Sequence, residues 1–350
     1  MTDPPVWTDP ERGYYDQRSR PRMRKRGFAE ALLLLFGLTL GALALEALAW
    51  VAERAQPTKG GYSPVRGRRS REPVNSAGYR DVEHTKEKPP GVRRAVFVGD
   101  SFTYGAGALL DDTYPKRTER ALSFSRSEKW ESIVLAVPGI GTEEEAKIIE
   151  SEAFAYSPDV LVLGYVLNDA EAPDAAERRR ATDWTAAEAL KRNPPLWRRS
   201  AFLRLVADRL HAARENRERS QNHLALYRDG APGFRAVRKS IDVMANRCRE
   251  KNVPFVVVLF PLFANPLDED YPFASVHEKM AAVCRSAGVT CLDLLPYYQG
   301  MDWHLLVVEG AKDEHPNEIA HRIAAQALVS ALESTPLSPM PPPSPPPQTR

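Results

Sequence analysis

The sequence predicts an α/β protein that is built on a parallel β-sheet and preceded by one membrane-spanning helix. Two patterns carry this expectation. From about residue 92 onward, short and almost purely apolar runs alternate with stretches of helical character, which is the order of elements in a parallel sheet. Ahead of them, residues 28–52 form one long apolar segment without lysine or arginine.

The N-terminal region divides into a basic leader and this apolar segment. Residues 13–27 hold six lysines and arginines, whereas residues 53–67 hold three. The segment 28–52 reaches the roughly 20 residues that a membrane span requires if Glu46 lies at the interface on the outer side of that membrane. The positive-inside rule then places leader 1–27 in the cytoplasm and everything after residue 52 outside it.

A cleaved signal peptide is the alternative to this signal anchor. Ala42-Leu43-Ala44 and Ala47-Leu48-Ala49 both have the small residues of a cleavage site. The long polar leader and the apolar length favour the anchor. A buried core helix is disfavoured, because the segment has no polar stripe.

Five apolar runs are the predicted strands of the sheet: residues 94–99, 132–137, 159–164, 253–260 and 289–294. Each run is nearly continuous rather than alternating, which is typical of strands that are buried on both faces. The helical stretches between and after them are residues 113–124, 142–155, 233–250, 275–287 and 316–334. The sequence therefore predicts one α/β domain.

The boundaries of this domain follow from what surrounds it. Residues 53–72 have the composition of a linker, and residues 336–350 contain eight prolines, which predicts a disordered, extended tail. The domain then covers residues 73–335. Within it, residues 171–230 are longer than a simple connection between two parallel strands, and they are rich in Ala, Arg and Glu. We therefore expect an inserted helical cap there.

Composition excludes several other classes of protein. Hydrophobic residues are 43% and charged residues 27% of the 350 residues, which argues against wholesale disorder and against a multi-span membrane protein. A net charge of +2 argues against a nucleic-acid binder, and three cysteines exclude a disulfide scaffold. The histidines show no metal-ligand spacing, so we expect neither a metal nor a cofactor.

Polar residues follow the predicted strands where a site is expected, because sites in open α/β sheets form at the carboxyl ends of strands. Ser101 follows the first strand, Gly139 the second and Asn168 the third, while Asp313 and His315 stand where the last helix opens. A hydroxyl, a glycine turn, a carboxamide and an acid–imidazole pair are the groups that acyl transfer by a serine nucleophile requires.

The roles of these groups follow from their chemistry. A serine hydroxyl needs a base near neutral pH, so His315 is the candidate base for Ser101, with Asp313 orienting the ring. The N–H groups of Ser101 and Gly139 and the side-chain amide of Asn168 are candidate oxyanion donors. Helix caps, turn residues and a surface imidazole are the simpler alternatives for these five positions. We expect the neighbouring Asp100 and Asp169 to bond loop backbone.

Taken in order, these residues resemble a known family. The four blocks of the SGNH hydrolases, also called the GDSL lipase/esterase family, are matched by Gly99-Asp100-Ser101, Gly139, Asn168-Asp169 and Asp313-x-His315. Residues 75–80, NSAGYR, resemble the N-x-x-G-x-R stretch that precedes the serine in many membrane-anchored bacterial members. The resemblance covers residues 73–333, and its D-x-H spacing is shorter than the commoner D-x-x-H.

The resemblance implies a three-layer, flavodoxin-like fold and a Ser-His-Asp esterase with Ser101, His315 and Asp313 in those roles. An outward-facing anchor then implies a single-pass protein of the bacterial inner (cytoplasmic) membrane, with the catalytic domain on the periplasmic or extracytoplasmic side. The expected partners are ester-bearing small molecules, lipids or polysaccharides. An O-acetyltransferase of the cell envelope and a non-catalytic SGNH-like scaffold or binding module remain alternatives.

Overall fold

The computed structural model describes residues 22–55, 73–171, 196–263, 265–308 and 315–335. The chain divides into two compact units. One comprises Met1–Gln56 and Pro195–Arg209, and the other comprises Pro57–Pro194 and Leu210–Arg350. Most of the predicted leader and linker, part of the predicted cap and the predicted Pro-rich tail lie outside the described residues.

The larger unit is built on one sheet of five strands that pair in parallel. The strands are β1 (Val92–Gly99), β2 (Lys129–Ala136), β3 (Val160–Tyr165), β4 (Phe255–Leu259) and β5 (Thr290–Asp293). Their order in the sheet is β2-β1-β3-β4-β5, the flavodoxin-like order. The predicted α/β class and parallel sheet are therefore confirmed.

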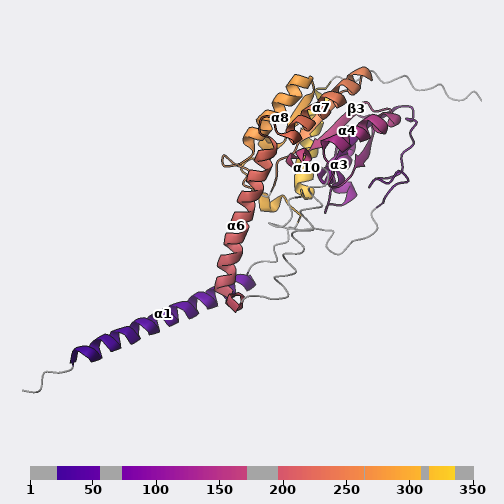
Figure 1. The fold of residues 1–350 in the computed structure, drawn as a ribbon. Coiled ribbons are helices and arrows are strands. Elements are labelled where there is room, and N and C mark those ends of the chain that lie inside the picture. Colours follow the sequence, from indigo (N-terminus) through magenta and orange to yellow (C-terminus); the bar gives the residue numbers. More distant parts are fainter. Residues whose placement is uncertain (1–21, 56–72, 172–195, 264, 309–314, 336–350) are drawn as a thin grey trace, which may run out of the picture. The chain divides into compact units, whose positions relative to one another are not determined.

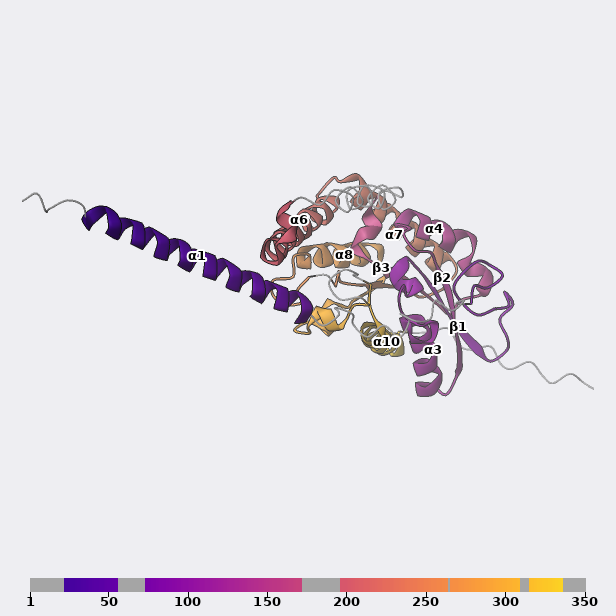
Figure 2. The same ribbon diagram turned by 90° about the horizontal axis from the view of Figure 1, so that it is seen from below.

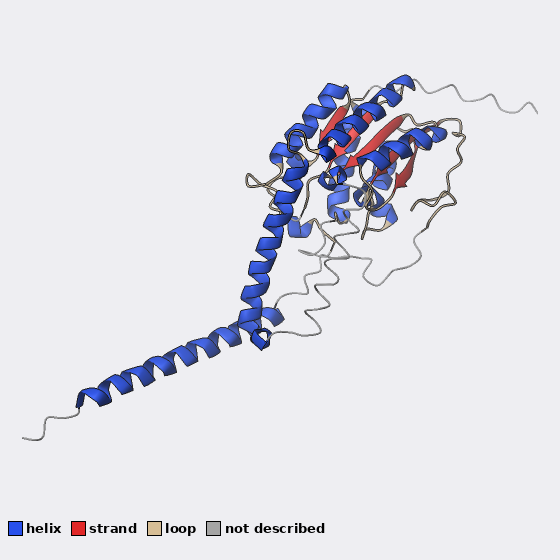
Figure 3. Cartoon of the chain, viewed as in Figure 1, coloured by secondary structure: helices blue, strands red, loops and turns tan. Residues whose placement is uncertain are grey.

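Helices cover both faces of this sheet (Figures 2 and 3). On one face lie α3 (Tyr114–Ser125) and α10 (Glu318–Glu333), and on the other lie α4 (Thr142–Ser151), α7 (Pro232–Glu250) and α8 (Ala274–Ala287). Right-handed crossovers explain the positions of α3, α4, α7 and α8, because the chain moves in one direction from β1 to β2 and in the opposite direction through β3, β4 and β5. The last helix, α10, follows β5 and packs against α3.

Two predicted helices differ from the observed ones at their ends. The predicted helix 142–155 is an α-helix only to Ser151, and a 3₁₀-helix, Ala153–Tyr156, follows it. The last helix begins at Glu318 rather than residue 316, because the side chain of Asn317 accepts hydrogen bonds from the N–H groups of Ile319 and Ala320 and so caps the helix.

A buried histidine joins the two helices on the first face. His321 of α10 is fully buried, and its Nδ1 accepts a hydrogen bond of 3.2 Å from the N–H of Tyr114, the first residue of α3. The two rings stack with centroids 6.1 Å apart. Burial lowers the pKa of His321 to about 3, which keeps the ring neutral and able to accept this bond.

The smaller unit contains one long helix, α1 (Arg22–Ala55), which Figure 1 shows as unbroken. Its segment Phe28–Ala52 has 25 residues with a mean hydropathy of 2.2, and it is long and apolar enough to cross a membrane. The predicted N-terminal apolar helix is therefore present. The first turns of α6 (Ala201–Leu226) belong to the same unit.

Two glycines make room for the turn that follows β1. Gly99 ends β1 and lies in register with Gly164 of β3. A Cβ at either position would collide with the hydroxyl of Thr103, and one at Gly164 would also meet the Tyr114 hydroxyl. Thr103 therefore sits directly over the sheet and holds its short helix against the strand ends, with a 3.0 Å hydrogen bond between the Thr103 and Tyr114 hydroxyls.

We predict that Gly164→Ala lowers the free energy of unfolding by about 1–3 kcal/mol, because the new methyl group overpacks the space filled by Thr103. Urea denaturation of Gly164→Ala, Thr103→Ala and the double variant measures this. The double variant should lose less than the sum of the two single losses, since it removes the nearer of the two colliding hydroxyls. Additive losses would contradict the proposed collision.

Candidate active site

The nucleophile candidate lies at the carboxyl end of strand β1, which lies between β2 and β3 in the sheet. Asp100 follows β1 and caps the short helix α2 (Ser101–Tyr104), because its Oδ1 accepts a 2.8 Å hydrogen bond from the N–H of Phe102. Gly105 ends the helix with a φ of 76°, in the left-handed region that favours glycine. This tight strand–turn–helix leaves Ser101 half-buried at the edge of the sheet.

His315 lies against this serine. Its Nε2 is 2.9 Å from Ser101 Oγ, although the two residues are 214 positions apart. The imidazole also packs on Phe102, with ring centroids 5.6 Å apart, and Phe102 in turn packs edge-on against Phe260 at the end of β4. The structure therefore brings together the predicted nucleophile and the predicted base at hydrogen-bonding distance.

The loop that carries His315 is held by backbone pairing with residues 305–308. The carbonyl of His315 accepts a 3.1 Å hydrogen bond from the N–H of Val308. Asn317 donates through its N–H to Leu306 O at 2.8 Å and through Nδ2 to Leu305 O at 2.8 Å. Asn317 is thus both helix cap and loop clamp. The sequence analysis did not identify it, although an Asn just before a helix is a recognisable capping signal.

Asn168 and Ser101 both contact the carboxylate of Asp100. Asp100 Oδ2 is 3.2 Å from Ser101 Oγ and 3.5 Å from Asn168 Nδ2, so the carboxamide and the hydroxyl meet at one oxygen. The 3₁₀-helix that contains Asn168 follows β3 and is capped by Asp169, whose Oδ2 accepts a 2.7 Å bond from the N–H of Val166. Asp100 and Asp169 bond loop backbone, as predicted.

The remaining two predicted site residues are Gly139 and Asp313. Gly139 follows β2, the neighbour of β1, and the N–H of Val137 donates to Gly99 O at 3.1 Å, which holds the start of this loop against the end of β1. The φ of Gly139 is 82°, a backbone conformation that favours glycine. Asp313 lies outside the described residues.

An arginine ahead of strand β1 holds the loop after Ser101. Arg80 is buried, and its guanidinium donates to the carbonyls of Tyr104 at 2.6 Å, Gly105 at 3.0 Å and Ala108 at 2.6 Å. Asn75 Oδ1 accepts hydrogen bonds from the N–H groups of Ala77 and Tyr79 and so shapes the turn that presents this arginine. The stretch N-x-x-G-x-R therefore holds the loop after Ser101 through hydrogen bonds from Arg80.

Three buried carboxyl groups lie next to the candidate site: Asp100, Glu145 and Asp169. Burial raises the pKa of all three, and the negative charge of Asp100 pushes the pKa of Glu145 and of Asp169 in the same direction. Neither carboxyl oxygen of Glu145 has a hydrogen-bond partner among the described residues. Its only sequence signal is the helical spacing of four residues between Glu145 and the apolar Ile149.

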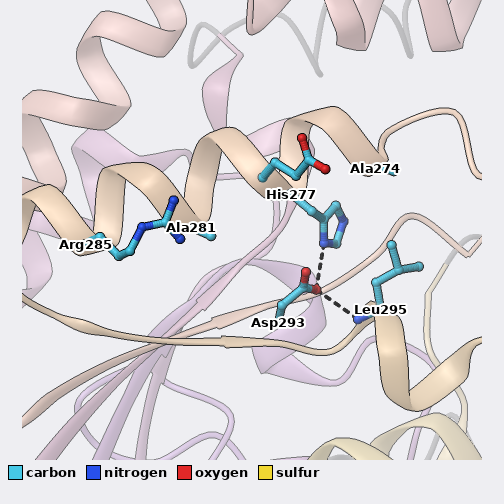
Figure 4. Close-up of a pocket in the computed structure, with 7 residues that line it drawn as sticks. Ala274, His277, Ala281, Arg285, Asp293 and Leu295 are labelled. Carbon is cyan, nitrogen blue, oxygen red and sulfur yellow. Dashed lines mark hydrogen bonds and ion pairs between the residues drawn. The ribbon is translucent and has the colours of Figure 1, made fainter.

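A histidine–carboxylate pair away from the candidate site lies in a pocket beside α8, shown in Figure 4. His277 Nδ1 is 2.7 Å from Asp293 Oδ1, and the same oxygen accepts a 2.9 Å bond from the N–H of Leu295. Among the described residues that line this pocket, none is a serine, threonine or cysteine. The pair therefore connects α8 to the end of β5. Within the described ranges, no group of three His, Cys, Asp or Glu side chains could hold a metal ion.

Comparison with known proteins assigns the family. Residues 97–323 match the model of the GDSL-like lipase/acylhydrolase family, which is more than half of the chain. The chain belongs to this family. As a GDSL-like lipase/acylhydrolase, it is a hydrolase that acts on ester bonds. No curated protein matches the chain in sequence.

Several solved structures are distantly similar to this chain. A G-D-S-L family lipolytic protein from Desulfitobacterium hafniense DCB-2 is 10% identical, with 68% of this chain and 98% of that chain covered and a TM-score of 0.41. LAE5, an alpha/beta hydrolase from the metagenome of Lake Arreo, Spain, is 17% identical, with 70% and 97% covered and a TM-score of 0.44. Because these TM-scores are below 0.5, the assignment rests on the family match.

We predict that Asn317→Ala lowers both the free energy of unfolding and the kcat of ester hydrolysis. We expect Asn317→Asp to lower mainly kcat. The aspartate keeps the oxygen that caps α10 but loses the donor to Leu305 O. Loss of the cap should cost about 1–2 kcal/mol in urea unfolding, and displacement of His315 should lower kcat by up to about a hundredfold. A fully active Asn317→Asp enzyme would show that the clamp does not position His315.

We predict that Glu145→Gln gains stability relative to the wild type as pH rises above 4.5, the ordinary pKa of a glutamate. The folded wild type keeps its proton, which the unfolded chain releases above that pH, so the wild type loses up to about 1.4 kcal/mol per pH unit. The glutamine has no such proton to lose. Urea unfolding from pH 4 to 8 measures the difference, and a pH-independent difference would contradict a raised pKa.

Proposed function

We propose that the chain is a membrane-tethered serine esterase in which Ser101 is the nucleophile, His315 the base and Asp313 the acid that orients His315. The observation that carries this proposal is the 2.9 Å separation of Ser101 Oγ and His315 Nε2 at the carboxyl edge of the sheet. Membership of an ester-hydrolysing family supports it. Asp313 is included because it stands two residues before His315 and carries the chemistry that a general base needs from a partner.

The reaction follows from these positions. His315 Nε2 takes the proton of Ser101 as Oγ attacks the ester carbonyl carbon, and the carbonyl oxygen becomes an oxyanion. When the carbon–oxygen bond of the ester breaks, the leaving alkoxide takes that proton from His315 and departs as an alcohol. Water then attacks the acyl-serine with His315 again as base, and the carboxylic acid leaves while Ser101 recovers its proton.

The oxyanion donors in this proposal are the N–H groups of Ser101 and Gly139 and the Nδ2 amide of Asn168. Three observations support them. Ser101 is the first residue of α2, so its N–H has no acceptor within the helix. Gly139 has a left-handed φ in the loop after the neighbouring strand. Asn168 Nδ2 approaches the Asp100 oxygen that also contacts Ser101 Oγ.

The proposed location and substrate follow from the N-terminal helix. Phe28–Ala52 would span the bacterial inner membrane as an uncleaved anchor, and the greater positive charge before it would keep the N-terminus in the cytoplasm. The catalytic domain would then work on the periplasmic or extracytoplasmic side. The substrates that we propose are ester-bearing polysaccharides or lipids of the cell envelope.

We predict that the full chain in detergent hydrolyses p-nitrophenyl acetate and that Ser101→Ala lowers kcat by roughly 10⁶-fold, because the variant lacks the attacking hydroxyl. His315→Ala should lose a similar amount. His277→Ala is the matched control, since His277 is also paired with an aspartate but lies in a pocket without a nucleophile. Equal rates for Ser101→Ala and the wild type would overturn the proposal.

The same variants define the substrate. Release of acetate from an O-acetylated polysaccharide, or of fatty acid from a phospholipid, should disappear in Ser101→Ala. If both substrates remain intact while p-nitrophenyl acetate is cleaved, the envelope substrate is wrong and the serine mechanism stands.

A further inference from the structure

A second part of the chain belongs to the same compact unit as the apolar helix α1. It comprises the 3₁₀-helix Leu196–Arg199 and the first turns of α6. We propose that residues 196–209, called here the interfacial segment, bind the surface of an anionic phospholipid bilayer and are held at headgroup depth by Glu46. This inference rests on the proposed membrane span of α1.

Glu46 connects the interfacial segment to the apolar helix. Its carboxylate accepts hydrogen bonds from Ser200 Oγ at 2.6 Å, from the N–H of Ala201 at 2.5 Å and from the N–H of Phe202 at 3.1 Å. The N–H groups at the start of a helix have no acceptor within that helix, and a carboxylate in an apolar span is costly without donors. The contact therefore satisfies both groups at once.

Burial on both sides of this contact agrees with close packing. Ala49, one turn after Glu46, and Ala201 are buried, whereas the apolar side chains of the rest of the span are exposed. Small residues at these two positions allow the backbones to approach each other closely.

The position of Glu46 sets the depth of the interfacial segment. A helix of 25 residues is about 38 Å long, which exceeds the roughly 30 Å of the hydrocarbon core, so its last turns reach the headgroup layer. Glu46 lies six residues before Ala52, or roughly 9 Å along the helix from the end of the apolar segment. Ser200 and Phe202 therefore lie near the boundary between headgroups and acyl chains, where amphipathic helices bind.

The interfacial segment exposes the side chains that such a boundary accommodates. Trp197, Leu203 and Val206 have exposed fractions of 41%, 45% and 39%. Leu203 and Val206 are three residues apart and so share one face of α6. Apolar side chains on one face, preceded by a tryptophan, are typical of a helix that lies in the plane of a membrane interface.

The charge of the interfacial segment favours anionic lipid over a neutral surface. It contains Arg198, Arg199, Arg204 and Arg209 against a single acid, Asp208, which lies 3.5 Å from Arg198 and leaves a net charge of +3. Arg198 lies 5.6 Å from the ring of Trp197, and Arg54 lies 3.6 Å from the ring of Trp50 at the end of the span. Both parts of this unit therefore present a Trp–Arg pair, which combines an interfacial ring with a headgroup-binding cation.

Spin labelling of the full chain tests this proposal. After serine replaces Cys248, Cys284 and Cys291, a nitroxide is attached through Leu203→Cys or, as the matched control, through Asp208→Cys. Position 208 is five residues further along α6 and roughly 140° around it. In phosphatidylglycerol–phosphatidylethanolamine vesicles, oxygen should relax the label at 203 more than a water-soluble nickel complex does, and the order should reverse at 208.

A second variant tests the role of Glu46. Glu46→Leu makes the span more apolar, so the protein should still float with vesicles, but the label at 203 should lose its access to oxygen. Replacing the anionic lipid with phosphatidylcholine should also reduce that access. Unchanged oxygen access in both conditions would contradict the hold by Glu46 and the preference for anionic lipid.

Three further results would overturn the proposal, and they are distinguishable. A label at 203 that is as accessible to nickel as the label at 208, on protein that floats with vesicles, shows that the segment lies in water while the span stands. Spin–spin broadening with shielding from both reagents shows that a second copy of the chain covers this face. Protein that does not float with vesicles shows that the proposed span itself is wrong.

Discussion

The contact between Thr103 and the paired glycines Gly99 and Gly164 is the constraint on which the candidate site depends. A side chain at either glycine would push the short helix Ser101–Tyr104 away from the strand ends. Arg80 also holds this turn, because its guanidinium donates to three carbonyl oxygens. The nucleophile candidate therefore has a position that is set by packing and hydrogen bonds before any substrate binds, which is the preorganisation that catalysis uses.

The polar groups around this turn carry a stability cost that the fold offsets elsewhere. Asp100, Glu145 and Asp169 are buried together, and their raised pKa values reflect the cost of charge in that environment. The sheet compensates with strands whose side chains are almost wholly buried, from Val160 to Tyr165 in β3 and from Phe255 to Leu259 in β4. A large apolar core thus supports an edge that is rich in buried carboxyl groups.

The smaller unit follows the same principle at a different place. Glu46 is a polar group in an apolar helix, and it is satisfied by donors from a segment 154 to 156 residues away. In both units an acidic side chain caps the start of a helix, Asp100 for α2 and Glu46 for α6. Carboxylates suit this role because the exposed N–H groups and the dipole at a helix start favour negative charge.

The sequence by itself determined the order of strands and helices, the apolar N-terminal helix and the residue types at the strand ends, because local periodicity and short motifs encode them. Only the tertiary structure decided that His315 meets Ser101, that Asn317 clamps its loop and that Glu145 is buried. It also decided that residues 195–209 of the predicted cap join the unit of the apolar helix. These features depend on contacts between residues far apart in the chain, which no local pattern specifies.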